Sequence, residues 1–557
     1  MLVSYICVVY MNDNYALDGY GIGSDEDWHS PARSRYENRA GPPGLSCEHR
    51  RMTHSDPIFD RLTSSGQPFA IGKRDEMRQF VNAPSDLNTL IESARRHSDK
   101  TFIVEGERRL SFEQTFQLRD ALAAELDIEP GQRAVICMRN RSEWLIAFLA
   151  IIRRGGVAAL VNSRGSPTAL REAVEEIDPA IVLADDERAA LLRKGGYEGR
   201  ILEAAEFPGG GSPVSLPPIE RDADDPCAIL FTSGTTGRIK GAVLTHRNII
   251  NGLMSVQLSG LMVLHDIAAK MGVEPEDLMA QMPQPATMLV YPLFHISGLG
   301  ASFLNPLCAG SKLVLIRRWD AEEAARIIER DRITMFSGVP TMMWDLLHAA
   351  RKTGADLSSL RNVASGGQAL PVNLLDEVRA LCPEAVMGTG YGMTETAGSV
   401  AMAVGEDFIR NRASAGRVLS LIDMRIEGPD GTVLGPGEAG EIVVRGPVVM
   451  AGYWQNSEET AKSFTEDGWL KTGDVGCIDE EGYVFIVDRK KDMVISGGEN
   501  IYCAEVERVL GEMPGIAECA TFGIPDDRLG ELLVAVVRTD RPLCADQVKQ
   551  QIGESLA

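Results

Sequence analysis

Buried strands that alternate with helices are the feature of this sequence that most restricts its fold. Apolar runs at residues 134–140, 157–162 and 180–186 have the length and composition of buried strands. Between them, SEWLIAFLAIIRRGG and a run at 167–176 have the pattern of helices. Strands joined through helices in this way run parallel, because a crossover helix returns the chain to the same edge of the sheet. The sequence therefore predicts an α/β fold, with doubly wound βαβ subdomains in a large N-terminal domain.

A β-rich segment follows the alternating part of the chain. After about Ser414 the sequence changes to short strands separated by tight turns such as GPDG (428–431) and DEEG (479–482). We expect a small β-barrel-like subdomain over about 415–487. The last segment contains a helical pattern and the apolar strand LLVAVVR (532–538), which predict a small α+β C-terminal domain.

The predicted organisation has three parts. Residues 1–56 are expected to form a disordered extension, because 12–56 are rich in Asp, Ser, Arg, Gly and Pro and lack hydrophobic periodicity. The large N-terminal domain spans 57–489, and a small, mobile C-terminal domain spans 490–557. Residues 261–287 are expected to be a helical insertion in the large domain.

Charge and cysteine content restrict the partners and the compartment. The chain has 79 acidic and 56 basic residues and a formal net charge of −23, which disfavours nucleic acid as a partner. Ten cysteines are scattered without a C-x-x-C pair, as in reduced cytoplasmic proteins. Because no run approaches 18 apolar residues, we expect a soluble protein with no integral membrane association.

The stretch FTSGTTGRIKG (231–241) directly follows the buried strand CAIL. Glycines leave backbone N–H groups accessible, and short hydroxyls with a nearby ammonium complete a cradle for phosphate oxygens. The stretch fits neither G-x-x-x-x-G-K-[ST] nor G-x-G-x-x-G, so it is not a Walker A loop or a dinucleotide fingerprint. The alternative is a flexible surface loop.

Three further motifs follow in order: YGMTETAG (391–398), LKTGD (470–474) and DRKKDMVISGGENIY (488–502). Together with the first stretch they resemble the AMP-forming adenylating superfamily, which includes acyl-CoA and aryl-CoA ligases, luciferases and peptide-synthetase adenylation domains. The resemblance covers about residues 86–557. It implies that the chain uses ATP, Mg²⁺ and coenzyme A to activate a carboxylic acid through acyl-AMP.

The resemblance assigns the phosphate contacts of ATP. Thr394 is implied to contact phosphate, and Glu395 is implied to hold Mg²⁺, which usually takes one or two protein carboxylates. The residues of the first stretch that hold the β- and γ-phosphates would be Thr232, Ser233, Gly234, Thr235, Thr236, Gly237 and Lys240.

The same resemblance assigns the nucleoside contacts. Tyr391 would lie against adenine, beside the SGGQAL loop with Gly366, Gly367 and Gln368. This loop carries Ala369 where many members of the superfamily have Pro.

Asp474 and Arg489 would contact the ribose, and Arg489 also phosphate. The alternative for Asp474 is an Asx turn. The alternative for Arg489 is a solvated surface cation.

The acid would bind near YPLFHISG (291–298), where His295 resembles the gate residue beside the reacting carboxylate. The alternative is a histidine satisfied within the core. Val339, Pro340 and the small residues of GTGYG (388–392) would line an apolar pocket. This composition favours a medium- or long-chain fatty acid, with an aryl acid as the nearest alternative.

The last motif corresponds to the superfamily's conformational switch. Members rotate the small domain between adenylation and thioester formation. The hinge position falls on Lys491, and Gly497, Gly498 and Glu499 lie on the loop that approaches the site in the thioester state.

One feature of the superfamily is missing. The resemblance implies a Lys in a G-K dipeptide near the C-terminus, but no G-K pair occurs after Arg489, and Lys549 has no Gly before it. We therefore expect a truncated small domain and impaired adenylation, with thioester formation less affected. A protein that binds the adenylate with little turnover, or an adenylation module that serves a carrier protein, stays open as an alternative.

Overall fold

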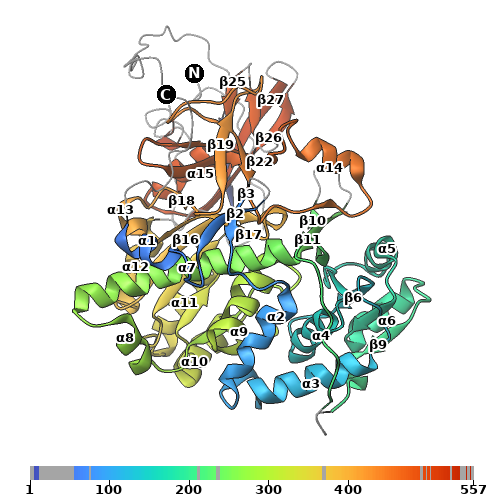
Figure 1. Cartoon of the computed structure of the whole chain (residues 1–557). Helices are drawn as coiled ribbons and strands as arrows, with labels where there is room; N and C mark the ends of the chain where they lie inside the picture. Colours follow the sequence, from blue (N-terminus) through green and yellow to red (C-terminus); the bar gives the residue numbers. More distant parts are fainter. Residues whose placement is uncertain are drawn as a thin grey trace. The chain divides into compact units, whose positions relative to one another are not determined.

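The structure is a computed structural model that describes residues 6–11, 56–74, 77–209, 214–233, 239–366, 372–489, 493–496, 499–501, 503–526, 530–539, 547–548 and 552. The chain forms two compact units (Figure 1). The larger unit contains residues 54–486. The smaller unit combines residues 1–53 with 487–557.

A seven-stranded sheet contains the alternating segment that the sequence predicted. Its strand order is β21-β11-β10-β7-β6-β8-β9. The strands β10, β7, β6, β8 and β9 run parallel, whereas β11 is antiparallel to β10 and to β21, which confirms the parallel βαβ prediction. The bounds are β6 Arg133–Cys137, β7 Val157–Leu160, β8 Ile181–Ala184, β9 Ile201–Glu203, β10 Pro226–Ser233, β11 Ile239–Thr245 and β21 Gly452–Tyr453.

Helices connect these strands. The α4 helix (Ser142–Arg153) is buried along nearly all of its length, because its sequence is apolar on every side. The α5 helix (Pro167–Ile177) is amphipathic, begins at the Ser166 cap and buries only Leu170, Ala173, Val174 and Ile177. The other helices of the first third of the chain are α1 Pro57–Thr63, α2 Leu87–Glu92, α3 Phe112–Glu125 and α6 Asp186–Lys194.

The larger unit also contains a thirteen-stranded sheet. Its order is β19-β20-β22-β23-β18-β17-β16-β15-β14-β12-β13-β4-β5. The six strands from β16 to β4 are parallel, and the strands from β16 to β19 continue as the β-rich part. The parallel strands are β4 Thr101–Glu105, β12 Ala286–Leu289, β13 Lys312–Leu315, β14 Met335–Ser337, β15 Asn362–Gly366 and β16 Val386–Met393. The last strand in the order, β5 Arg108–Ser111, pairs antiparallel with β4.

The β-rich part comprises β17 Gly398–Val404, β18 Gly416–Val418, β19 Asp423–Glu427, β20 Gly440–Arg445, β22 Leu470–Ile478 and β23 Tyr483–Arg489. The helices α10 Ala321–Asp331, α11 Pro340–Thr353 and α12 Val372–Leu381 contribute to the same apolar core as the parallel strands. These elements agree with the predicted combination of doubly wound and β-rich parts.

The predicted insertion is helical. The α7 helix (His246–Met271) begins at a Thr245–Asn248 capping box and ends at Gly272, which has a φ of +69°. The α8 helix (Pro275–Gln281) packs near its end (Figure 1). Within the described residues, α7 is the one helix whose length and composition would allow it to cross a membrane. Such a helix is weak evidence for a span, because core helices of soluble proteins share these properties.

The smaller unit contains a sheet with β1 Ile6–Met11, β24 Val494–Ser496, β25 Glu499–Ile501, β26 Ile516–Asp526 and β27 Gly530–Thr539, and the helix α15 Cys503–Glu512. The prediction of disorder for residues 1–56 is wrong for residues 6–11. The β1 strand pairs parallel with β27, from Ile6 opposite Leu533 to Met11 opposite Arg538. The apolar, β-branched run ICVVYM supplies an edge strand for the equally apolar β27, whereas the prediction of disorder rested on the composition of residues 12–56.

A buried histidine fixes the start of α7. His246 is 1% exposed, and its Nδ1 accepts a hydrogen bond from the Leu87 backbone N–H at 3.0 Å. The proton of the neutral ring therefore lies on Nε2. Burial lowers the pKa of His246 to about 4, because a charged ring would lose its hydration.

This pKa predicts acid sensitivity. The unfolded chain binds a proton at His246 near pH 6.5, whereas the folded chain binds it only near pH 4, so stability falls as the pH drops through this window. The share of His246 is about 3 kcal/mol at full protonation. We expect His246→Asn, which keeps an acceptor, to lose this share of the pH dependence in urea unfolding. His348→Gln, on the exposed side of α11, should have the same pH dependence of unfolding as the parent. If His246→Asn also keeps the pH dependence of the parent, the assignment to His246 is contradicted.

Candidate active site

The proposed phosphate stretch connects β10 and β11. Thr232 lies opposite Lys240 and Ser233 opposite Ile239, so the hairpin carries the connecting loop at its end. The Thr232 hydroxyl donates to the Lys240 backbone oxygen at 3.4 Å. Four predicted contacts, Gly234, Thr235, Thr236 and Gly237, lie outside the described residues.

Lys240 has two partners that the sequence analysis did not identify. Its ammonium forms an ion pair with Glu459 on α14 (Ser457–Ser463) and lies 5.3 Å from the centroid of the Tyr453 ring. The Lys240 side chain is only 12% exposed. The cation is therefore held between a carboxylate and an aromatic face.

Glu395 lies in the short helical turn η5 (Thr394–Thr396), next to Thr394, and is 5% exposed. The Tyr453 hydroxyl donates to Glu395 Oε1 at 2.8 Å. Burial, and then the charge of Glu395, raise the pKa of Tyr453, so the phenol remains a protonated donor. Tyr453 thus contacts both predicted phosphate-site residues, Lys240 through its ring and Glu395 through its hydroxyl.

Tyr391 and Asp474, which the sequence placed on adenine and ribose, lie together. The Tyr391 hydroxyl donates to Asp474 Oδ2 at 2.7 Å, and Asp474 is 6% exposed. Pairing between β20 and β22 is irregular beside Asp474, where Gly473 has a φ of +74°. Such a bulge re-aims the following side chain. Two residues that are 83 positions apart therefore share one hydrogen bond.

The loop that the sequence placed beside adenine is described only in part. Gly366 ends β15 and lies opposite Gly390 of β16. Gly367 and Gln368 lie outside the described residues. The structure therefore places Gly366 one strand away from Tyr391 and leaves the other two residues as predictions.

His295 lies between β12 and η4 (Ser297–Leu304), and more than a third of it is exposed. Its ring lies 4.5 Å from that of Phe294. The surrounding protein still lowers the pKa of His295, first by removing water and second through the charge of Arg164. The neutral form is therefore favoured, and the exposure differs from that of a satisfied core histidine.

The residues predicted for the conformational switch fall largely outside the described residues. Arg489 ends β23, whereas Lys491, Gly497, Gly498 and Lys549 are not among the residues described. Their predicted roles, and the expected effect of the missing G-K lysine, stay predictions.

The donor groups of the site suit Mg²⁺ that is bound partly by substrate phosphates better than a metal ion held by protein side chains alone. The described residues contain no group of three or more His, Cys, Asp and Glu that could hold a metal ion. Mg²⁺ is usually held by one or two carboxylates together with substrate phosphates. Glu395, a single buried carboxylate in the same cluster as Lys240, has the required oxygen chemistry.

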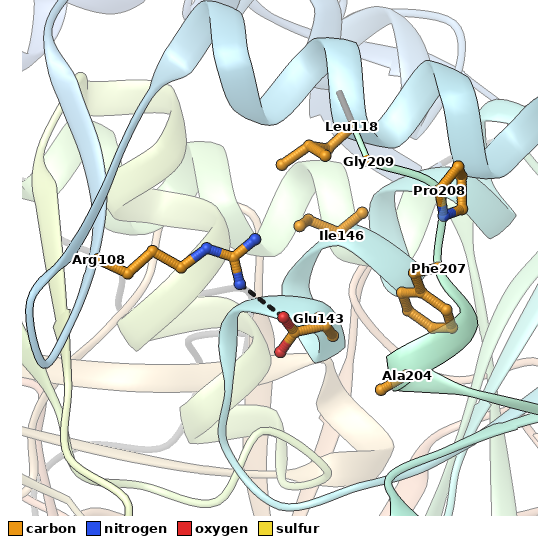
Figure 2. A pocket seen from close by; sticks show the side chains of 8 residues that line it. All are labelled: Arg108, Leu118, Glu143, Ile146, Ala204, Phe207, Pro208 and Gly209. Atoms are coloured by element: carbon orange, nitrogen blue, oxygen red, sulfur yellow. Dashed lines mark hydrogen bonds and ion pairs between the residues drawn. The ribbon is translucent and has the colours of Figure 1, made fainter. Parts of the chain in front are cut away.

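A separate pocket lies beside α3 and α4, and none of the predicted site residues lines it (Figure 2). Its polar side consists of Arg108, whose guanidinium forms an ion pair with Glu143 at 2.6 Å. Its apolar side includes Leu118, Ile146 and Phe207. Because Glu143 already neutralises Arg108, this pocket offers no unpaired cation to a substrate carboxylate.

A glycine beside Tyr391 illustrates how tightly the backbone is packed at the predicted adenine contact. A Cβ on Gly392 would lie 2.0 Å from the carbonyl oxygen of Gly398, on the neighbouring strand β17. No side chain other than hydrogen fits there without separation of β16 from β17.

We therefore expect Gly392→Ala to lower the free energy of unfolding by more than about 2 kcal/mol. The matched control is Gly260→Ala within α7, where an added Cβ meets nothing within 4 Å. It should raise stability by about 0.5–1 kcal/mol, because alanine favours helix. Urea unfolding checks both variants, and equal stabilities would show that the strands accommodate the methyl group.

Comparison with protein families gives a match over most of the chain. Residues 90–454 match the AMP-binding enzyme family. Residues 505–557 match the C-terminal domain of AMP-binding enzymes. The first match includes Lys240, Glu395 and Tyr453, whereas Asp474 follows its end.

Relatives with assigned activities act on different acids. A feruloyl-CoA synthase of an Amycolatopsis species is 36% identical over 74% of this chain and 79% of its own length. A 2-succinylbenzoate–CoA ligase of Bacillus licheniformis is 33% identical over 84% of this chain and 93% of its own. A long-chain-fatty-acid–CoA ligase of Mycobacterium tuberculosis is 30% identical over 79% and 84%.

Solved structures agree with the fold. The o-succinylbenzoate coenzyme A synthetase of Bacillus subtilis, in complex with its acyl-adenylate intermediate, has a TM-score of 0.70 and 29% identity. The match covers 84% of this chain and 92% of that one. The same enzyme in complex with ATP and a magnesium ion has a TM-score of 0.71. The predicted α/β fold, with a large N-terminal and a small C-terminal domain, is confirmed.

Proposed function

Because this chain belongs to the AMP-binding enzyme family, whose members here are ATP- and CoA-dependent ligases, we propose that it activates an apolar carboxylic acid to its CoA thioester. The observation that carries the proposal is the cluster in which Tyr453 links Lys240 to Glu395. A cation and a buried carboxylate fixed this way suit a metal-bound polyphosphate.

The reaction has two steps. A carboxylate oxygen of the acid attacks the α-phosphorus of ATP, the bond from the α-phosphorus to the bridging oxygen breaks, and pyrophosphate leaves. The CoA thiolate then attacks the acyl carbon, and AMP leaves with the electron pair of the acyl–oxygen bond. Neither step needs a covalent bond to the protein, so positioning and charge stabilisation carry the catalysis.

The residues of the larger unit have separate tasks in this proposal. Lys240 and Thr394 bind phosphate oxygens, and Asp474 accepts hydrogen bonds from the ribose hydroxyls. His295, held neutral, lies beside the acid without adding a charge to the reacting carboxylate. Glu395 would hold Mg²⁺, which supplies charge neutralisation of the phosphates when bound.

We propose a medium- or long-chain fatty acid as the substrate. The segments 291–298 and 338–341, which contain His295, Val339 and Pro340, have no charged residue of their own, and this composition favours an apolar tail. The relationship to a long-chain-fatty-acid–CoA ligase supports this choice. The second candidate is an aryl acid, favoured by the relationship to a feruloyl-CoA synthase, which has the higher identity.

A panel of acids separates these candidates. We expect ATP-dependent pyrophosphate release with octanoic and palmitic acids, and a CoA thioester only when CoA is added. Mass spectrometry of the thioester checks the result. Faster turnover of ferulic or 2-succinylbenzoic acid would select the aryl candidate. A single burst of pyrophosphate that CoA does not continue would instead indicate an adenylate-binding protein with little turnover.

The proposed ribose contact can be tested by binding alone. We expect Asp474→Asn to weaken AMP binding by about 1.5–3 kcal/mol, the range for hydrogen bonds to a charged group. Isothermal titration calorimetry measures this loss. Asp467→Asn, which removes an exposed carboxylate paired with Arg425, is the control and should bind AMP as the parent does. If all three proteins bind AMP with equal affinity, Asp474 has a structural role and does not contact the ribose.

A further inference from the structure

A carboxylate already occupies the position next to the cation that is expected to receive phosphate. Glu459 pairs with Lys240, and both side chains are largely withdrawn from water, at 24% and 12% exposure. The two residues are 219 positions apart, so the pair depends on the tertiary fold and not on helix propensity. No feature of the local sequence pointed to Glu459.

The fold holds this pair from several sides. The β21 strand pairs with β11, with Tyr453 opposite Ala242, and this places the Tyr453 ring against the Lys240 ammonium. The Asn456 side chain caps α14 by accepting from the Glu459 backbone N–H at 3.1 Å. Because this cap fixes the first turn of α14, it also fixes the position of the Glu459 carboxylate beside Lys240.

Glu459 also has a second cation within reach. Lys462, one turn further along α14, lies 3.3 Å from Glu459 Oε1. Hydrogen bonds from Lys240 and then Lys462 hold the pKa of Glu459 below its ordinary value. A carboxylate that leaves Lys240 can consequently remain paired, which lowers the cost of its displacement.

We infer that Glu459 is a resident counter-ion of Lys240, which the phosphates of ATP displace and which re-forms its pair when pyrophosphate leaves. This inference rests on the proposed function. Phosphate oxygens and the Glu459 carboxylate compete for one ammonium, so the free protein avoids a poorly solvated lone cation. The returning carboxylate also favours release of pyrophosphate. Glu459 is a positioning residue, because it acts through Lys240.

The competition predicts an unusual direction of change. Glu459→Gln removes the competing charge and should bind ATP and inorganic pyrophosphate about fivefold more tightly, as expected from a partly exposed ion pair. Glu458→Gln is the matched control on the same helix. Glu458 is 79% exposed and pairs with Lys462 and not with Lys240, so the control should bind as the parent does. Calorimetry on the full chain measures each affinity.

Stability gives a second readout that a merely structural role would not reproduce. Without nucleotide, Glu459→Gln should unfold at a lower temperature than the parent, because Lys240 has lost its partner. At saturating ATP the difference should disappear, since the pair is broken in both proteins. Glu459→Asp, which keeps the charge on a shorter side chain, should have an intermediate affinity for pyrophosphate and serves if the glutamine variant folds poorly.

The outcomes separate this inference from the proposed function. A parent chain that binds ATP and pyrophosphate, with a Glu459→Gln variant that binds them equally or more weakly, overturns the inference alone. A stability deficit that persists at saturating ATP also overturns it. A parent chain that binds neither ligand overturns the proposed function and the inference together.

Discussion

The pairing of β21 with β11 is the interaction on which the candidate site depends. Backbone hydrogen bonds from Ala451 to Val243 at 3.0 Å and from Trp454 to Gly241 at 2.7 Å attach this two-residue strand to the phosphate hairpin. A third bond, from the Met450 N–H to the backbone carbonyl oxygen of Glu395 at 2.8 Å, continues the attachment to η5. The β21 strand thereby places Tyr453 beside Lys240 and Glu395, which lie much earlier in the chain.

Two buried carboxylates of the site share one arrangement. Glu395 accepts from Tyr453, and Asp474 accepts from Tyr391. A phenol satisfies a buried carboxylate without adding a positive charge, so the negative charge stays available to a metal ion or to ribose hydroxyls. Each tyrosine comes from a different element than its carboxylate: Tyr391 lies on β16 and Asp474 on β22, whereas Tyr453 lies on β21 and Glu395 in η5.

Local patterns allowed much of this structure to be predicted. The parallel strands and their helices were predicted because burial on both faces leaves continuous apolar runs. The motif residues Lys240, Glu395 and Asp474 were found because each lies in a short, distinctive stretch. Tyr453 and Glu459 were missed, since a tyrosine after glycine and one glutamate among several have no local signature. Strand β1 was missed for a related reason: its partner, β27, lies more than 500 residues later.

The net charge explains why short-range contacts must carry nucleotide binding. A chain with a formal charge of −23 repels a polyanion such as ATP at a distance, so its net charge does not steer the nucleotide toward the site. At physiological ionic strength this repulsion is screened beyond about 8 Å. At shorter distances, nucleotide binding depends on individual charged groups of the site. The ion pair with Glu459 keeps the Lys240 side chain ordered in the protein without nucleotide. If the phosphates displace Glu459 as inferred above, a multiply charged ligand replaces the resident carboxylate at a net gain, whereas a lone carboxylate or a chloride ion does not.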